Sequence, residues 1–253
     1  MILLLIFVFI FCLCLRFPIA FSLGLSCLVY FIFKGTPLVV VPLKMYAGID
    51  VFVLLSIPGF IIAGNLMNQG GLTDKIINFC NHLLGHIRGG LSYVNISASM
   101  LFAGISGTAI SDTASLGAVM IPAMKKEGYH SDFSCAITAA SSTIGPIIPP
   151  SLPMIIAATL SGLSVGKLFL AGAIPGLLLG MGLMMVAYFV AKKKNYPKHQ
   201  KSTSLQVLKS FIDTFWALLM TLIILFGIIG GVFTPTEASV VAVLYALFIG
   251  TFV

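Results

Sequence analysis

The stretch FAGISGTAISDTASLG, residues 102–117, places small residues, hydroxyl groups and one carboxylate, Asp112, between two strongly apolar segments. Glycine costs backbone entropy in a helix, and serine, threonine and aspartate compete for its backbone hydrogen bonds, so we expect a helix break here. If the flanking segments lie in lipid, such a break persists only where protein or a water-filled cavity surrounds it. The stretch then predicts a binding site rather than a lipid-facing surface.

The composition places the flanking segments in a membrane. Of the 253 residues, 59% are hydrophobic and only 8% are charged, whereas a soluble domain has about 25% charged residues. Because so few charges cannot cover a water-soluble surface, we expect an all-α polytopic membrane protein. The formal net charge of +7 comes largely from lysines in short segments, which is typical of cytoplasmic loops rather than of a nucleic-acid surface.

The cysteines and histidines indicate neither a metal centre nor an enzyme. The five cysteines form no CxxC pair and are scattered through apolar segments, so we interpret them as small buried side chains. His82 and His86 either bind a metal ion or form a polar helix face, and we favour the polar face. The apolar segments contain no histidine–carboxylate set and no glycine-rich phosphate loop, which argues against an enzyme.

The N-terminal segments are interpreted as membrane helices. The opening apolar run has no basic stretch before it and no A-x-A site after it, so we expect a retained transmembrane segment rather than a signal peptide. Residues 1–33 would form a helix of about 50 Å, so RFPIAF, residues 16–21, marks a turn, a kink or a strong tilt. Residues 49–68 predict one span, and residues 74–86 predict an amphipathic interfacial helix.

Residues 89–125 predict a re-entrant helical hairpin. Its arms, Leu91–Ile105 and Thr113–Met124, reach about 22 Å or less as helices, whereas a bilayer core is about 30 Å thick. The break between them is expected at Ser106–Asp112. Basic residues flank the pair on both sides, which indicates that both ends face the cytoplasm.

Residues 131–165 predict a discontinuous transmembrane helix. The run is too long for one upright span and contains TIGPIIPPS, residues 143–151. Its prolines remove backbone N–H donors and stop regular helix. We therefore expect two half-helices that meet near the membrane midplane.

Residues 192–210 are the strongest orientation marker, because this segment carries six lysines. The positive-inside rule places it in the cytoplasm, as a solvated loop in preference to a lipid-headgroup contact. Further along, Thr234 is expected to cap a helix that begins at Pro235, with Glu237 completing a capping box. That assignment gives Glu237 a structural role rather than an ion-binding one.

The two breaks predict an ion site between them. Carbonyl groups exposed at one half-helix end coordinate Na⁺, and N–H groups exposed at the other attract anions. Hydroxyl groups of the first break add neutral oxygen ligands, which suit a hard cation: they belong to Ser106, Thr108, Ser111 and Thr113. Both breaks are expected at a similar depth, where packing against each other would enclose the ion.

Two features of the first break have a second interpretation. Asp112 ligates Na⁺ or accepts a proton, or it caps the second hairpin arm by accepting from the N–H groups of Thr113–Ser115. Gly104, Gly107 and Gly117 serve the ion site or let helices pack closely. We favour the ion site for these glycines, because close packing does not require the prolines of the second break.

Several long motifs then resemble one family. GISGTAISDTASLGAVMIPAMKKEGY and ASSTIGPIIPPSLPMIIAATLSG resemble the large membrane subunit of TRAP transporters, the tripartite ATP-independent periplasmic transporters, of the DctM-like type. FPIAFSLGL, IPGFIIAGNLMNQGGL and TPTEASVVAVLYALFIG match in the same order. The resemblance covers essentially the whole chain.

The resemblance implies a function and partners. It implies an elevator-type member of the ion transporter superfamily that imports an organic acid, such as a C4-dicarboxylate or a sialic acid, in the bacterial inner membrane. The import is expected to be driven by Na⁺ as the coupling ion, without a further cofactor. The implied partners are a small membrane subunit and a periplasmic substrate-binding protein. Family members are considerably longer, so this chain is expected to correspond to a transporter half that is truncated after its first repeat.

The break geometry and the resemblance together give the expected organisation and site. Four regions are expected: scaffold helices with an interfacial arm helix (1–88), a transport region (89–191), a basic cytoplasmic loop (192–210) and an incomplete second repeat (211–253). The expected Na⁺ ligands are Ser106, Gly107, Thr108, Ser111, Asp112, Gly145, Ile148 and Pro149. Thr113 and Ser151, taken as half-helix starts, are expected to face the substrate carboxylate.

Two other functions compete with this one. The first is a single-component Na⁺/carboxylate symporter or antiporter of the same superfamily, which would not co-purify with a small membrane subunit. The second is a truncated membrane fragment that inserts without transporting anything.

Overall fold

A computed structural model describes residues 2–252, with the backbone alone at residue 252. The chain divides after Val51 into two compact units, and each is described by itself. Over the described residues the secondary structure is helical and contains no strand, as expected for the all-α class. Within the described part of the chain, three helical segments are long and apolar enough to cross a membrane: Phe52–Gln69, Val165–Lys194 and Ser204–Ile229.

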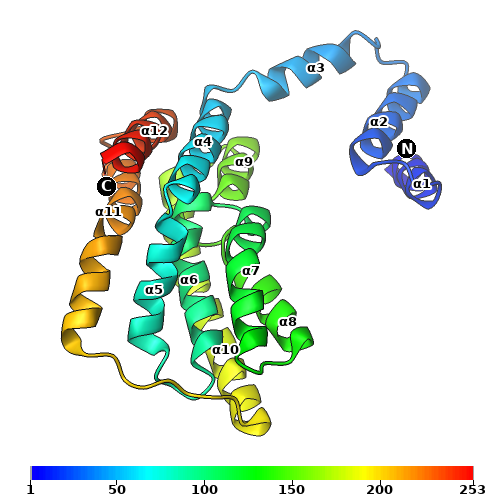
Figure 1. Cartoon of the computed structure of the whole chain (residues 1–253). Coiled ribbons are helices and arrows are strands. Elements are labelled where there is room, and N and C mark those ends of the chain that lie inside the picture. The colour runs from blue at the N-terminus through cyan, green and yellow to red at the C-terminus, as the bar shows by residue number, and fades with distance from the viewer. Residues whose placement is uncertain (1, 253) are drawn as a thin grey trace. The chain divides into compact units, whose positions relative to one another are not determined.

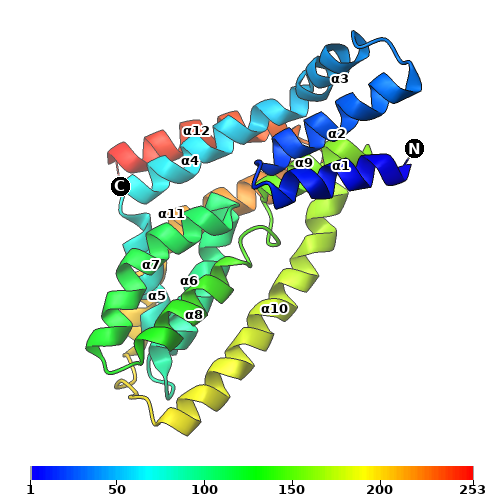
Figure 2. The same cartoon turned by 90° about the vertical axis from the view of Figure 1, so that its right-hand side faces the viewer.

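The first unit contains three helices, α1 (Ile2–Cys14), α2 (Ile19–Lys34) and α3 (Val40–Ile49). α1 and α2 pack side by side (Figure 2). Between them Arg16 has left-handed backbone with φ 64°, and the Phe17 N–H donates to the Cys12 carbonyl at 3.1 Å. Of the three alternatives for RFPIAF, the structure therefore contains the turn.

The second unit is built around the hairpin. Its elements in chain order are η1 (Phe52–Leu55), α4 (Ser56–Gln69), α5 (Leu72–Leu84), α6 (Gly90–Ser106), α7 (Ala109–Lys126), α8 (Ser131–Ser142), α9 (Leu152–Ser161), α10 (Val165–Lys194), α11 (Ser204–Ile229) and α12 (Pro235–Phe252). α6 and α7 lie antiparallel, and α8 packs against both (Figure 1). α12 packs along α4, and α10 runs beside α6 and α8 (Figure 2).

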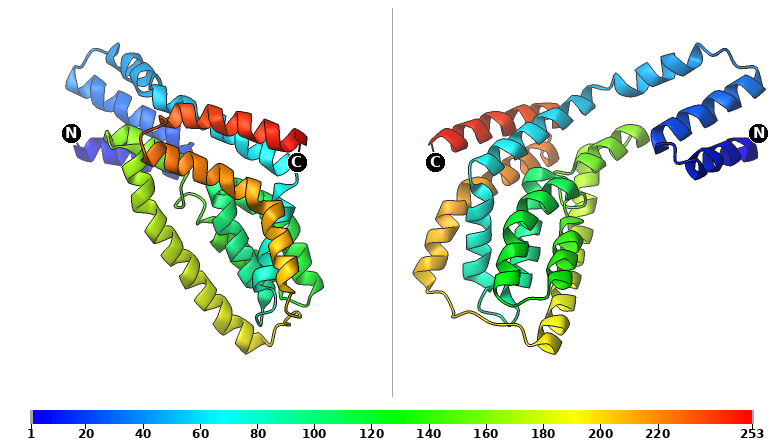
Figure 3. Two further views of the ribbon diagram at one scale, coloured as in Figure 1. Left: turned by 90° about the vertical axis from the view of Figure 1, so that its left-hand side faces the viewer. Right: turned by 45° about the vertical axis from the view of Figure 1, so that its right-hand side comes forward.

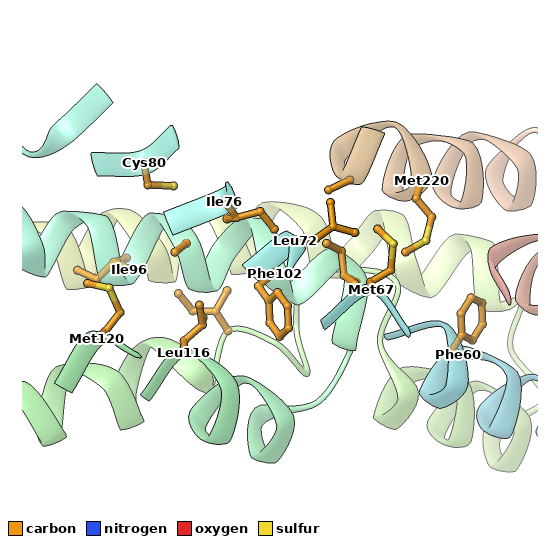
Figure 4. Close-up of a cluster of buried hydrophobic side chains, with 14 of the residues drawn as sticks. Phe60, Met67, Leu72, Ile76, Cys80, Ile96, Phe102, Leu116, Met120 and Met220 are labelled. Carbon is orange, nitrogen blue, oxygen red and sulfur yellow. The ribbon is translucent and has the colours of Figure 1, made fainter. Parts of the chain in front are cut away.

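The core of the second unit lies around α6. Phe102 of α6 and Leu116 of α7 are almost completely buried, and Figure 4 shows them facing each other between the two helices. Leu72, Ile76 and Cys80 of α5 recur at a spacing of four and are equally buried. The amphipathic helix expected over residues 74–86 therefore uses its apolar face for packing against α6 and α11.

Capping residues set several helix ends differently from the sequence expectations. α10 continues to Lys194, and Asn195 ends it in left-handed conformation. α11 begins at Ser204, because Thr203 and Gln206 form a capping box. The basic connection is therefore shorter than residues 192–210.

Two further expectations are decided by local contacts. Glu237 Oε2 accepts from the backbone N–H of Thr234 at 2.8 Å, which confirms the expected capping box. Of the five cysteines, only Cys12 and Cys80 are buried. The other three are exposed on apolar helices, so the expectation of burial is wrong for Cys14, Cys27 and Cys135.

Candidate ion site between two helix breaks

The first break contains only two residues, Gly107 and Thr108. Gly107 has left-handed backbone, with φ 61°. Thr108 is extended, and its Oγ1 accepts from the Ser111 N–H at 3.3 Å, so it caps α7. Because threonine satisfies a free N–H of the new helix, regular structure resumes at Ala109 rather than after Asp112.

Asp112 lies in the first turn of α7 and is completely buried. Its Oδ1 accepts a hydrogen bond from the hydroxyl of Ser106, and its Oδ2 has no hydrogen-bond partner among the described residues. Since Thr108 is the cap, the interpretation of Asp112 as the helix cap is wrong. A carboxylate at this position is still favoured by the positive end of the α7 dipole.

The second break spans residues 143–151, as expected. After α8 the N–H groups of Ile147 and Ile148 both donate to the Ile144 carbonyl at 2.9 Å, forming turns rather than helix. α9 begins at Leu152 and is capped by Ser151, whose Oγ accepts from the Met154 N–H at 3.3 Å. The broken helix is therefore two separate helices, α8 and α9.

The two breaks are in direct contact. The Leu152 N–H at the start of α9 donates to the Gly107 carbonyl at 3.3 Å. A Cβ added to Gly107 would lie 2.6 Å from the Pro150 carbonyl oxygen. A Cβ added to Gly145 would lie 2.5 Å from Asp112 Oδ2. The expectation that the breaks meet is confirmed. Glycine is required at Gly107, because its φ is positive and a Cβ there would meet a backbone oxygen, whereas a Cβ at Gly145 would displace the Asp112 side chain.

Buried polar contacts align α6 with α8 below the breaks. The Asn95 amide donates to Thr138 Oγ1 at 2.7 Å, and the Ser99 hydroxyl donates to Ser141 Oγ at 2.9 Å. All four side chains are completely buried. Each hydrogen bond fixes the height of one helix against the other, and so fixes the distance between the first break and the second.

A cavity of about 340 Å³ opens between the hairpin tip and α4. It is lined by Ile61, Gly64, Asn65, Ser106, Thr108, Ile110, Ser111 and Ala114. Asn65 was not among the residues that the sequence singled out. An amide inside the apolar run of residues 49–68 was the signal that could have identified it, because polar side chains at membrane depth are costly and usually functional.

Four expected site residues do not line the cavity beside Asn65. Thr113 is the fifth residue of α7 rather than a helix start; it is exposed, and its hydroxyl donates to the Ala109 carbonyl at 2.8 Å. Ile148 and Pro149 line a different, largely apolar cavity of about 360 Å³ beside α10 and α11. Ser151 is completely buried, and its hydroxyl donates to the Pro146 carbonyl at 2.6 Å.

The remaining groups fit a hard cation. Ser106, Thr108, Ser111 and Asp112 supply oxygen atoms within one turn of the break, and oxygen donors are those that alkali and alkaline-earth ions prefer. Within residues 2–252 the buried Asp112 Oδ2 lacks a hydrogen-bond partner, and a buried carboxylate without a counter-charge is strongly unfavourable. A cation beside it would remove that cost.

The fold and the site together define an all-α membrane protein whose two interrupted helices meet at a buried carboxylate. A family model described as "Tripartite ATP-independent periplasmic transporter, DctM component" matches residues 6–253. The chain therefore belongs to the DctM family, whose members are permeases, and thus transporters rather than enzymes.

Three relatives show how far the similarity extends. The sialic acid TRAP transporter large permease protein SiaM of Vibrio cholerae serotype O1 is 46% identical over 237 residues, which are 93% of this chain and 56% of the relative. The 2,3-diketo-L-gulonate TRAP transporter large permease protein YiaN of Escherichia coli K12 is 44% identical over 81% of this chain and 48% of its own length. The C4-dicarboxylate TRAP transporter large permease protein DctM of Pseudomonas aeruginosa is 41% identical over 92% of this chain and 55% of its own length. The chain spans about half the length of these relatives.

Proposed function

We propose that the chain acts as the large permease subunit of a sodium-driven tripartite transporter that imports an organic acid. Its proposed partners are a small membrane subunit and a periplasmic binding protein that delivers the substrate. Family membership supports this assignment, and the relatives are named for sialic acid, 2,3-diketo-L-gulonate and C4-dicarboxylate. We propose a carboxylate substrate of that class.

The observation that carries the ion coupling is the contact between the two breaks. The Asp112 side chain reaches from the first break towards Gly145 of the second, and no described residue forms a hydrogen bond with its Oδ2. Na⁺ at this position would bind the carboxylate together with hydroxyl oxygens of Ser106, Thr108 and Ser111. Occupancy would draw the hairpin tip and the broken helix together, which couples the ion to the shape of the cavity beside Asn65.

The proposed topology follows from charge at one end of the second unit. The Gly89 N–H, just before α6, donates to the Pro197 carbonyl of the basic connection at 2.9 Å. Glu127, just after α7, pairs with His199 of the same connection at 2.8 Å. Both hairpin ends therefore lie beside the lysine-rich segment, and the positive-inside rule favours the cytoplasm for all three. We propose accordingly that the hairpin is re-entrant, in the inner membrane, within an elevator-type transport region.

Direct sodium binding tests this proposal without requiring transport. The purified full chain in nanodiscs is expected to bind ²²Na⁺ in competition with unlabelled Na⁺ but not with choline. Asp112→Asn should weaken the binding at least about tenfold, since it removes a buried charge partner. Thr113→Ala is the matched control, because that hydroxyl contacts only its own helix.

Two results would overturn parts of the proposal. Equal ²²Na⁺ binding by the native chain and Asp112→Asn would remove the ion site. Sodium-independent uptake of labelled organic acid, in vesicles with the small subunit and binding protein, would remove the coupling while leaving a carboxylate permease.

A further inference from the structure

Another cavity with a polar lining lies between the end of α5 and the start of α11. It has a volume of about 350 Å³. Five polar residues line it: His82, His86, Lys201, Ser202 and Ser204. Figure 3 shows the connection from α10 to α11 passing the end of α5 on its way to this place.

The connection between α10 and α11, residues 195–203, is held by several contacts. His82 Nδ1 lies 3.0 Å from the Ser202 hydroxyl, and the His199 N–H donates to the Gly85 carbonyl at 3.3 Å. Tyr196, which is 4% exposed, stacks on Tyr129 with ring centroids 4.2 Å apart. The cavity is therefore a built feature of the fold.

The lining groups share one chemistry: they donate hydrogen bonds. Lys201 supplies an ammonium group, the serines supply hydroxyls, and each imidazole donates at least one N–H. His86 Nδ1 is buried and has no hydrogen-bond partner among the described residues. No carboxylate is among the described residues that line the cavity. Ser204 is also the first residue of a long helix, whose N-terminus adds a positive dipole end.

The surface next to the cavity is apolar and continues along α11. Leu205, Leu208 and Ile212 are 75%, 55% and 57% exposed, and they follow one helical stripe that reaches Trp216. Leu83 on α5 is 46% exposed beside the same cavity. A cavity lined by hydrogen-bond donors at the start of an exposed apolar stripe is complementary to a phospholipid. The phosphate would lie in the cavity and the acyl chains along the stripe.

We propose that this cavity binds a phosphoryl group, and that its source is the headgroup of an anionic phospholipid. Lys201 and His86 contact the phosphate, while the serine hydroxyls and the first turn of α11 accommodate its other oxygens. Trp216 lies about 18 Å along α11 from Ser204. An acyl chain that runs from the cavity along the stripe therefore passes the indole, the chain's only tryptophan.

Fluorescence quenching of Trp216 tests the lipid directly. The full chain is placed in phosphatidylcholine nanodiscs that contain either brominated phosphatidylglycerol or brominated phosphatidylcholine at the same fraction. The anionic quencher is expected to act more strongly. Lys201→Ala should reduce that preference about fivefold, the contribution of one basic residue near a lipid surface, and His86→Ala should reduce it without removing a contact that holds the connection.

Lys198→Ala is the matched control, because it removes the same charge from the same connection outside the cavity. An equal loss in Lys198→Ala and Lys201→Ala would mean that bulk charge is responsible and would overturn the site. A second measurement adds inorganic phosphate, against chloride at equal ionic strength, and follows thermal unfolding. Phosphate stabilisation of the native chain but not of Lys201→Ala, with no lipid preference, would assign the site to free phosphate; absence of both effects would overturn it.

Discussion

Ser106 is the residue through which the first break controls its own carboxylate. Its hydroxyl donates to Asp112 Oδ1 and accepts from the Thr108 N–H at 3.3 Å. Replacing it with alanine leaves both carboxylate oxygens unpaired and removes one proposed Na⁺ ligand. We expect Ser106→Ala to weaken ²²Na⁺ binding about tenfold, because it removes one oxygen ligand and the hydrogen bond that orients the carboxylate. Binding as tight as that of the native chain would exclude Ser106 from the site.

Gly107 permits the close approach of the two breaks. It is constrained both by its positive φ and by a close backbone atom, whereas Gly162 is constrained by its positive φ alone. Gly107 has a positive φ and faces the Pro150 carbonyl, whereas Gly162 has φ 69° with open space around it. Gly162→Ala should therefore cost about 1–2 kcal/mol of backbone strain. Gly107→Ala should cost a further 1–3 kcal/mol or so from overpacking, measured as a lower unfolding temperature in detergent. Equal unfolding temperatures for Gly107→Ala and Gly162→Ala would show that the contact with Pro150 accommodates a side chain.

At the scale of elements, the hydrogen bonds between α6 and α8 hold the two breaks in register. Ser99→Ala removes the donor to Ser141 and should destabilise the packing of α6 against α8 by about 1 kcal/mol. The Leu152 N–H, which donates to Gly107, reports this destabilisation through its hydrogen-exchange rate. We expect about fivefold faster exchange there by mass spectrometry. Ser161→Ala, whose hydroxyl donates only within α9, should leave the rate unchanged.

The elements also show which features a sequence can predict. The capping box at Thr234–Glu237 was predictable because both partners lie within one turn of helix. The existence of each break was predictable from its glycine and prolines, but the extent of the first was not. Thr108 and Asp112 both suit a cap, and the Ser111 N–H, which donates to Thr108 Oγ1, decides between them. Asn65 was missed because it approaches the hairpin tip from α4, a contact between distant segments.

At the scale of the whole molecule, α10 sets the distance between the two ends of the second unit. Its 30 residues correspond to about 45 Å of helix, enough to cross a bilayer core of about 30 Å. Lys192–Lys194 close it at the end where the connection meets both ends of the hairpin. Ser164 occupies the N-cap position at its opposite end. A membrane crossed by α10 therefore separates Ser164 from the connection.

Cysteine labelling in spheroplasts tests this arrangement. In a background without the five native cysteines, Ser164→Cys should react with a membrane-impermeant maleimide added outside. Lys126→Cys and Lys198→Cys should react only after permeabilisation, because the end of α7 and the connection are expected on the cytoplasmic side. All three positions are exposed, so a lack of reaction reports sidedness rather than burial. Labelling of Lys126→Cys from outside, with Lys198→Cys still protected, would show that the hairpin crosses the membrane instead of returning, and the re-entrant geometry would have to be abandoned.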